Sequence, residues 1–428
     1  MIIRKYKIKS GEESAFAAGL AAKRASGAAG VDERVAEILA DVKSRGYEAV
    51  REYSLKPAPF DGVEPYELTR VQIDEIASSC DPRLYSVMER SAANVRDYQS
   101  RLLPQSRVWS TELGELGQLV RPLNRVGIYV PGGTAAYPSS VLMTAVPAKV
   151  AGVSEIVMCT PPTSNLNAAC VAAAKIAGVD RIFALGGVQA IAAMAYGAGP
   201  VPRADKIVGP GNAFVAAAKR LVFGEVDIDM IAGPSEIFIV ADDNANPIFA
   251  AADMLSQAEH DKLAAAILAT DSAAFADAVI AELERRLPEL PRSEIAASSL
   301  SDYGAVAVCD NLDSAVALAN CVAPEHLELI TADPHSLLNS IQNAGAIFVG
   351  GFSPEPLGDY SAGPSHVLPT NGTARFFSAL SVDSFIKRTS LVCATERGIQ
   401  NEAERIAKFA RAEGLEAHAK SAELRLCK

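Results

Sequence analysis

The chain has 428 residues, which is too long for one ordinary hydrophobic core and predicts at least two packed units. It is 49% hydrophobic and 21% charged, a composition typical of globular proteins and not of disordered ones. The formal net charge of −11 argues against a nucleic-acid partner, because binding to a phosphate backbone needs a basic surface.

The cysteine pattern indicates a reducing, cytoplasmic compartment. The seven cysteines are scattered, contain no CxxC spacing and are odd in number, so they predict neither a disulfide framework nor a cysteine zinc site. The N-terminus becomes charged at once and lacks the apolar core of a signal peptide. Two long uncharged stretches, 126–148 and 182–202, are interrupted by helix breakers, so we expect no membrane span.

In chain order, the first hundred residues have the apolar spacing of helices, over 31–44, 71–76 and 82–101, with a proline-broken linker at 56–59. From residue 125 onward, short apolar runs end in glycine or proline and are followed by alanine-rich helical stretches. The predicted strands are 126–130, 155–158, 181–185, 206–208, 236–240, 264–268, 303–308 and 346–349. The tail is predicted to be helical over 401–413 and strand-like over 422–426.

Alternating strands and helices are typical of parallel βαβ units, whose ligand sites lie at the carboxyl ends of the strands. We therefore predict an α/β fold of two Rossmann-like domains, one inserted in the other, with helical N- and C-terminal segments. The predicted boundaries are an N-terminal helical arm at 1–22, a large domain of 23–125 with 236–372, an inserted domain at 126–235 and a C-terminal helical tail at 373–428.

Histidines are the first candidates for chemistry because they are rare. They are His260, His326, His335, His366 and His418. A helix capped by Asn246 and begun by Pro247 should run to about His260. Gln257 and His260 would then share one face and could reach one metal ion. A solvated helix end explains the same pair equally simply, and the local sequence favours it.

Two further segments are candidate reactive sites. Glu325 and His326 stand side by side, and a neutral histidine can accept an alcohol proton while a carboxylate activates water. Such a dipeptide is common and often has no role. Residues 350–369 are proline-rich and predict a long functional loop, with Asp359 and His366 as its reactive groups. His335 and His418 read locally as surface residues.

The usual dinucleotide fingerprint is missing, since no GxGxxG follows any predicted strand. The glycine turns at 129–133 and 209–212 could let a ligand approach the backbone. Plain tight turns explain them equally well.

Taken together, these segments resemble the histidinol dehydrogenase family over nearly the whole chain. The strongest matching motifs are Val126-Gly-Ile-Tyr-Val-Pro-Gly-Gly133, Val208-Gly-Pro-Gly-Asn212, Ile231-Ala-Gly-Pro-Ser-Glu236, Ser256-Gln-Ala-Glu-His260, Ala323-Pro-Glu-His-Leu-Glu328, Gly358-Asp-Tyr360 and His366-Val-Leu-Pro-Thr370. The resemblance implies oxidation of L-histidinol to L-histidine by two NAD, through bound L-histidinal, with one zinc ion per subunit. It also implies that NAD binds to an incomplete variant of the dinucleotide fold.

The resemblance also implies a role for each matching residue. Glu325 and His326 correspond to the catalytic pair. The zinc ligands correspond to Gln257, His260, Asp359 and His418. The substrate contacts correspond to Ser235, Gln257, His260, His326, Asp359, His366, Glu413 and His418, and the NAD contacts to Tyr129, Gln189 and Asn212. His418 would come from the other subunit of a homodimer, so the tail would complete the partner's site.

These implied roles agree with elementary chemistry. Amide, imidazole and carboxylate ligands without thiolates indicate a zinc site that is open to substrate. His326 would act as base for both hydride steps, and Glu325 would activate the water that hydrates the aldehyde. Departures from the family pattern are Ser365, Asn371 and the longer segment 56–59.

Three alternatives remain at this point. A related zinc- and NAD-dependent dehydrogenase would use another small polar alcohol, but Glu413 favours a cationic substrate. A non-catalytic solute-binding protein would need a signal peptide. A thiol-dependent aldehyde dehydrogenase would need an activated cysteine, for which Cys321 is the nearest candidate.

Overall fold

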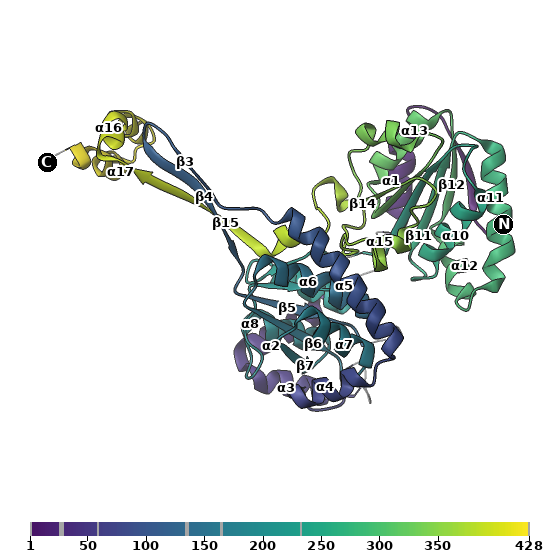
Figure 1. Cartoon of the computed structure of the whole chain (residues 1–428), viewed down its shortest axis with the longest axis horizontal. Helices are drawn as coiled ribbons and strands as arrows, with labels where there is room; N and C mark the ends of the chain where they lie inside the picture. Colours follow the sequence, from purple (N-terminus) through teal and green to yellow (C-terminus); the bar gives the residue numbers. More distant parts are fainter. Residues whose placement is uncertain are drawn as a thin grey trace.

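The computed structural model describes residues 2–24, 30–57, 60–132, 137–162, 166–231 and 233–426. They form two six-stranded sheets and one three-stranded sheet. Figure 1 shows two bodies, each built on one of the large sheets, and an extended arm that projects from one of them and carries the C-terminal helices.

The first large sheet is parallel throughout and has the order β1-β12-β11-β10-β13-β14. Its strands are β1 (Arg4–Ile8), β10 (Glu236–Ala241), β11 (Ala265–Thr270), β12 (Ala305–Cys309), β13 (His326–Ile330) and β14 (Ala346–Val349). The helices of this body are α1 (Glu13–Arg24), α10 (Pro247–Ala258), α11 (Ala273–Arg286), α12 (Ser293–Asp302), α13 (Leu312–Val322), α14 (Pro334–Leu337) and α15 (Glu355–Tyr360). The central strands β10, β11 and β13 are buried along their whole length, as parallel strands covered on both faces must be.

The second large sheet has the order β2-β7-β6-β5-β8-β9, in which only β2 is antiparallel to its neighbour. The strand order reverses between β5 and β8, which is the switch point of half a dinucleotide-binding fold. Its strands are β2 (Tyr66–Glu67), β5 (Arg125–Tyr129), β6 (Glu155–Thr160), β7 (Arg181–Ala184), β8 (Lys206–Val208) and β9 (Asp227–Ile228). The helices of this body are α2 (Val31–Arg45), α3 (Tyr47–Leu55), α4 (Arg70–Ser78), α5 (Pro82–Leu102), α6 (Pro138–Ala151), α7 (Ala168–Ala177), α8 (Gly187–Tyr196) and α9 (Ala213–Val222).

The arm is built on an antiparallel sheet of β3 (Arg107–Ser110), β4 (Gly114–Pro122) and β15 (Ile386–Ala394). Helices α16 (Glu396–Ala412) and α17 (Glu416–Glu423) pack on each other at its far end (Figure 1). Large apolar side chains remain exposed along it, among them Trp109, Val392, Phe409 and Leu424. An arm with so much exposed apolar surface indicates an interaction site.

The predicted α/β fold is confirmed, and so are the helices near 31–44, 71–76 and 82–101 and every predicted strand before the tail. The strand predicted over 422–426 is wrong, because those residues continue α17 into a 3-10 turn. The tail instead contains β15, and the helical arm predicted at 1–22 begins with β1. Both are sheet-edge strands with charged, largely exposed side chains, so they lack the apolar alternation that marks a half-buried strand.

The predicted boundaries placed residues 23–125 in one domain with residues 236–372, which form most of the first sheet. The helices of residues 31–102 instead cover the second sheet. Helix α2 packs against α8 and α9, α4 against α7, and α5 against α6 and α7. Val35, Ile38 and Val95 belong to cores of the second sheet, because their helices' apolar faces cover it. In the described part of the chain, no helix is long and apolar enough to cross a membrane.

The loop after β8 is held tightly against β5. Gly209 has a φ of +112°, and a Cβ there would lie 2.2 Å from the Tyr129 carbonyl oxygen. The Gly209 N–H donates to Asp229 Oδ2 at 2.8 Å, and Lys219 Nζ donates to the Gly209 carbonyl at 2.8 Å. Lys219 and Asp229 also form a buried ion pair. A side chain at this position would clash with the Tyr129 backbone, so only glycine fits here.

Gly209→Ala should therefore destabilise the protein strongly. Gly224 is the matched control, because it has a similar φ of +102° but a Cβ added there would have no atom within 4 Å. We expect Gly224→Ala to cost about 1 kcal/mol from backbone strain, and Gly209→Ala about 3 kcal/mol or more because a steric clash is added. Thermal unfolding midpoints measure the difference. Equal midpoints for the two variants would contradict the close approach of Gly209 to Tyr129.

Candidate active site

The candidate catalytic pair is held by the backbone of one residue, Glu236. Strand β13 begins at His326 and lies beside β10, where Ile237 is opposite His326. The Glu236 N–H donates to Glu325 Oε2 at 2.9 Å, and the Glu236 carbonyl oxygen lies 3.0 Å from His326 Nδ1. A carbonyl oxygen only accepts, so Nδ1 carries the proton and Nε2 presents its lone pair.

Burial controls the protonation of both groups. It lowers the pKa of His326 to about 4, so the imidazole is neutral near pH 7. Burial also raises the pKa of Glu325 well above its usual value, and the nearby carboxylates of Glu236, Asp359 and Glu355 add to this rise. A neutral imidazole has a lone pair that can accept a proton, and a carboxyl of raised pKa is a stronger base in its ionised form.

A second buried carboxyl, Glu355, faces the same imidazole. Its Oε1 lies 3.7 Å from His326 Nε2, and Ser256 of α10 donates to its Oε2 at 3.3 Å. Burial, with Asp359 nearby, raises the pKa of Glu355 to about 9. The prediction of a long structureless loop over 350–369 is wrong here, because helix α15 forms in it and buries Glu355 against α10. Its six residues are too few to show a helical period in the sequence.

The predicted metal ligands of the first body gather between α10 and α15. Gln257 is completely buried, and neither amide atom has a hydrogen-bond partner among the described residues. His260 lowers the pKa of both His326 and His366, so it lies near both rings. Asp359 Oδ1 is 3.7 Å from His366 Nδ1. His326, Glu355 and Asp359 offer ligand atoms within 4.8 Å of one another, a set that shares only Asp359 with the predicted ligands.

The helix end near Gln257 differs in detail from the prediction. Asn246 caps α10 and Pro247 begins it, as predicted, but the helix ends at Ala258. His260 lies in the turn beyond, where its N–H donates to the Gln257 carbonyl at 3.2 Å. The helix is therefore two residues shorter than predicted, and this i→i−3 hydrogen bond links the turn that holds His260 back to Gln257.

Two predicted substrate residues lie close to this cluster, and two do not. Ser235 directly precedes β10, and His366 Nε2 lies 3.3 Å from Ser140 Oγ. Glu413 and His418 are exposed residues at the end of α16 and on α17. Figure 1 places these helices at the far end of the arm, remote from α10 and α15 of the same chain.

The candidate cofactor residues lie at the carboxyl ends of the second sheet's strands, where a ligand site was predicted. Tyr129 ends β5, and its hydroxyl accepts the Gly187 N–H at 3.1 Å. Gln189 lies in the first turn of α8 after β7. Asn212 caps α9 after β8, accepting from two backbone N–H groups. Glu325, His326 and Ser235, in contrast, lie at the amino ends of β10 and β13.

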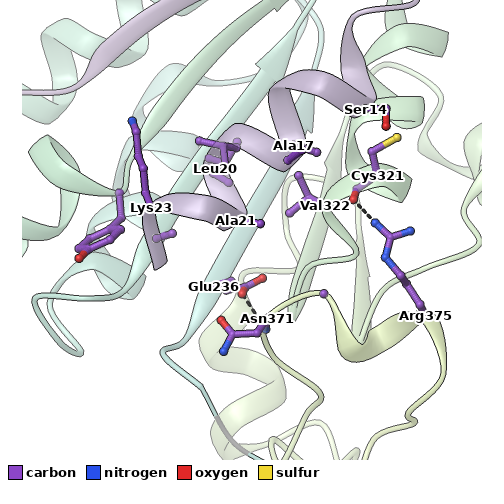
Figure 2. Close-up of a pocket in the computed structure, with 15 residues that line it drawn as sticks. Ser14, Ala17, Leu20, Ala21, Lys23, Glu236, Cys321, Val322, Asn371 and Arg375 are labelled. Atoms are coloured by element: carbon purple, nitrogen blue, oxygen red, sulfur yellow. Dashed lines mark hydrogen bonds between the residues drawn. The ribbon is translucent and has the colours of Figure 1, made fainter. Parts of the chain in front are cut away.

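A cavity of about 530 Å³ lies behind the catalytic pair, between α1 and the loop that contains Asn371 (Figure 2). The Glu236 side chain faces it, and Glu236 Oε1 accepts the Asn371 N–H at 2.8 Å. Asn371 has a φ of +54°, a left-handed conformation that glycine and asparagine adopt more readily than other residues. Ser365, the other departure, is buried and accepts the Val367 N–H at 3.2 Å.

The sequence analysis missed Glu236, Glu355 and Ser140 as parts of this site. Glu236 stands in one of the matching motifs and Glu355 lies between two prolines, so both had a local signal as acids at the edge of apolar segments. Ser140 had none, because its contact with His366 joins residues 226 positions apart.

Comparisons with known proteins point to one family. The family model described as histidinol dehydrogenase matches residues 21–426. Histidinol dehydrogenase of Moorella thermoacetica is 53% identical over 403 residues, covering 92% of this chain and 94% of the relative. That of Bacillus subtilis is 51% identical over 405 residues, covering 93% and 94%. A crystal structure of histidinol dehydrogenase from Elizabethkingia anophelis superposes with a TM-score of 0.94 at 35% identity, covering 99% of this chain and 98% of that one.

The lowered pKa of His326 predicts a pH dependence of stability. Between the ordinary pKa of 6.5 and the folded value of about 4, the unfolded chain binds a proton at His326 that the folded chain does not. Stability should therefore fall as the pH falls through this window, by up to about 3 kcal/mol from this group. His326→Gln lacks that proton, so its thermal midpoint should fall less steeply between pH 7 and pH 4.5. Parallel curves for the two proteins would contradict the burial of a neutral imidazole.

Proposed function

The chain belongs to the histidinol dehydrogenase family, and from that premise we propose that it oxidises L-histidinol to L-histidine, through bound L-histidinal, with two NAD. The observation that carries the proposal is the position of His326. Its Nδ1 is held by the Glu236 carbonyl, its Nε2 is directed to the cluster of α10 and α15, and its pKa is low enough to keep it neutral.

His326 can then act as the base of both oxidations. It accepts the alcohol proton at Nε2 as a hydride leaves the adjacent carbon, which gives the aldehyde and reduces the first NAD. In its ionised form Glu325, whose raised pKa makes the carboxylate a stronger base, accepts a proton from the water that adds to the aldehyde. The aldehyde oxygen takes up the proton that His326 received, which gives a hydrate with two hydroxyls and one hydrogen on the carbon and returns the imidazole to its neutral form. His326 can then accept a hydroxyl proton again as a hydride passes to a second NAD.

The residues between α10 and α15 fit a zinc ion. A buried amide without a partner, as at Gln257, is costly unless a ligand satisfies it, and Gln257, His260 and Asp359 supply the nitrogen and oxygen donors that zinc accepts. We propose that these three hold the ion together with His418 of a second copy. Bound zinc would act as a Lewis acid that orients the substrate's polar groups. Ser235 and His366 would contact the substrate from this chain.

The residues at the carboxyl end of the second sheet fit NAD. Gln189 is 1% exposed, and its Oε1 has no hydrogen-bond partner among the described residues, which is consistent with a ligand donor group there. Tyr129 and Asn212 lie at the ends of β5 and β8, on either side of the switch point. We propose that these three residues bind the cofactor.

We further propose a homodimer in which the arm of each copy completes the other's site. Glu413 and His418 lie on the arm and cannot serve the site of their own chain in the arrangement of Figure 1. The arm's exposed side chains, such as Phe409 and Val392, need an apolar partner. Glu413 would then offer a negative charge to a cationic substrate.

A cytoplasmic location is also part of the proposal. The cysteines that the structure describes support it, because all of them are free thiols. Cys427 lies outside the described residues.

The reaction predicts two NADH for each L-histidinol consumed. A zinc chelator should abolish NADH formation, and added zinc should restore it. Absorbance at the NADH band, together with quantified histidinol, gives the ratio. A ratio of one would contradict the two-step oxidation. If the protein binds zinc but forms no NADH from histidinol, its substrate is another alcohol.

The shared site predicts complementation between two inactive variants. His326→Ala and His418→Ala chains should each be inactive alone. In a mixed dimer one site has both defects and the other has none, so random reassembly should restore about a quarter of wild-type activity. Activity after unfolding and refolding the two variants together measures this. His335→Ala is the matched control for an arbitrary histidine change, and it should retain activity alone. No recovery in the mixed dimers would contradict the shared site.

A further inference from the structure

A carboxylate from a distant part of the chain occupies the start of helix α8. Asp61 belongs to the segment between α3 and β2. Its Oδ2 accepts the Gly186 N–H at 3.0 Å and the Gln189 Nε2 at 3.3 Å. Asp61 is half-buried, so this contact is not a chance encounter on an open surface.

The segment that carries Asp61 is itself anchored. The Gly62 N–H donates to the Lys56 carbonyl at 3.0 Å, which ties Gly62 to the residue that follows α3. The Phe60 ring lies 5.8 Å from the Tyr53 ring of α3, and the Arg34 guanidinium of α2 lies 5.9 Å from Phe60. These contacts hold the residue next to Asp61 against two helices, so the carboxylate has a defined position.

Asp61 determines which way the Gln189 amide faces. A carboxylate can only accept, so the amide must turn its NH₂ group to Asp61 and its oxygen away. Gln189 Oε1 then lies over Gly187, where a Cβ would be only 2.8 Å away, and it has no partner among the described residues. A buried acceptor without a donor is costly, and a ligand that supplies the donor removes that cost.

The same contacts occupy two N–H groups at the start of α8. The Gly186 N–H is bonded to Asp61, and the Gly187 N–H is bonded to the Tyr129 hydroxyl. Helix N-termini bind phosphates through such N–H groups, but these two are taken by the chain itself. Since Gln189 Oε1 is an acceptor, the group that meets it is a hydrogen-bond donor, such as a hydroxyl or an amide NH₂.

We propose that Asp61 is a positioning residue of the cofactor site, which holds the Gln189 amide so that its oxygen accepts a hydrogen bond from a hydroxyl or amide group of NAD. The inference rests on the proposed assignment of Gln189 to NAD. Asp61 itself acts through Gln189 and contacts neither the reacting carbon nor the catalytic pair.

The test compares NAD affinity in five full-length, zinc-loaded variants by titration calorimetry. Asp61→Ala should weaken NAD binding about tenfold, the loss expected for one misdirected hydrogen bond. It should raise the KM for NAD by a similar factor and leave the affinity for histidinol and kcat within about twofold. Asp61→Asn should bind NAD nearly as well as wild type, because one amide oxygen can accept both hydrogen bonds. Asp61→Ser is the substitute if the alanine variant does not fold.

Glu64→Ala is the matched control, because Glu64 lies on the same segment and pairs with exposed Arg51. It should not change NAD affinity. Gln189→Ala separates the two proposals: it should weaken NAD binding, and adding Asp61→Ala to it should have no further effect. If Gln189→Ala weakens binding and Asp61→Ala does not, the inference fails and the cofactor site stands. If neither changes NAD affinity, the assignment of Gln189 to NAD fails and the inference with it.

Discussion

The parallel pairing of β10 with β13 is the contact on which the chemistry of this protein depends. Both strands begin at the site, and the register puts one backbone unit, that of Glu236, against two consecutive side chains, Glu325 and His326. Each backbone group makes a different bond: the N–H holds the carboxyl, and the carbonyl selects the imidazole tautomer. A sheet is rigid, so its backbone holds the base in position without the conformational entropy that a loop would lose on ordering.

The two large sheets place their candidate sites at opposite ends of their strands. In the second sheet the candidate cofactor residues lie at the carboxyl ends, as is general for α/β folds. In the first sheet the catalytic pair lies at the amino ends of β10 and β13. Acids near these strand ends, such as Glu236 and Glu355, are buried and not solvated. The raised pKa of Glu355 follows from this loss of water.

Three features of the single chain are left incomplete. A single chain leaves an amide without a partner at Gln257, an acceptor without a donor at Gln189, and an apolar arm that extends away from both bodies, all within the part of the chain that the structure describes. Each of these features is unfavourable in an isolated subunit without ligands. Metal, cofactor and a second copy would satisfy one each, and this correspondence is the physical basis of the proposed assembly.

The sequence by itself determined the α/β class, eight of the twelve strands of the two large sheets and the segments that hold the chemistry. These follow from local periodicity, from helix caps such as Asn246 and from motifs that are recognisable one segment at a time. It did not determine that α2 to α5 cover the second sheet, or that Glu236 and Asp61 hold the candidate sites. Among the strands that it missed are β1, β2, β9, β15 and β13, which begins at His326. Those features depend on contacts between residues far apart in the chain. The free energy of such a contact is set by where the contacting residue lies in the fold, and not by the local sequence pattern. Only the tertiary structure could decide them.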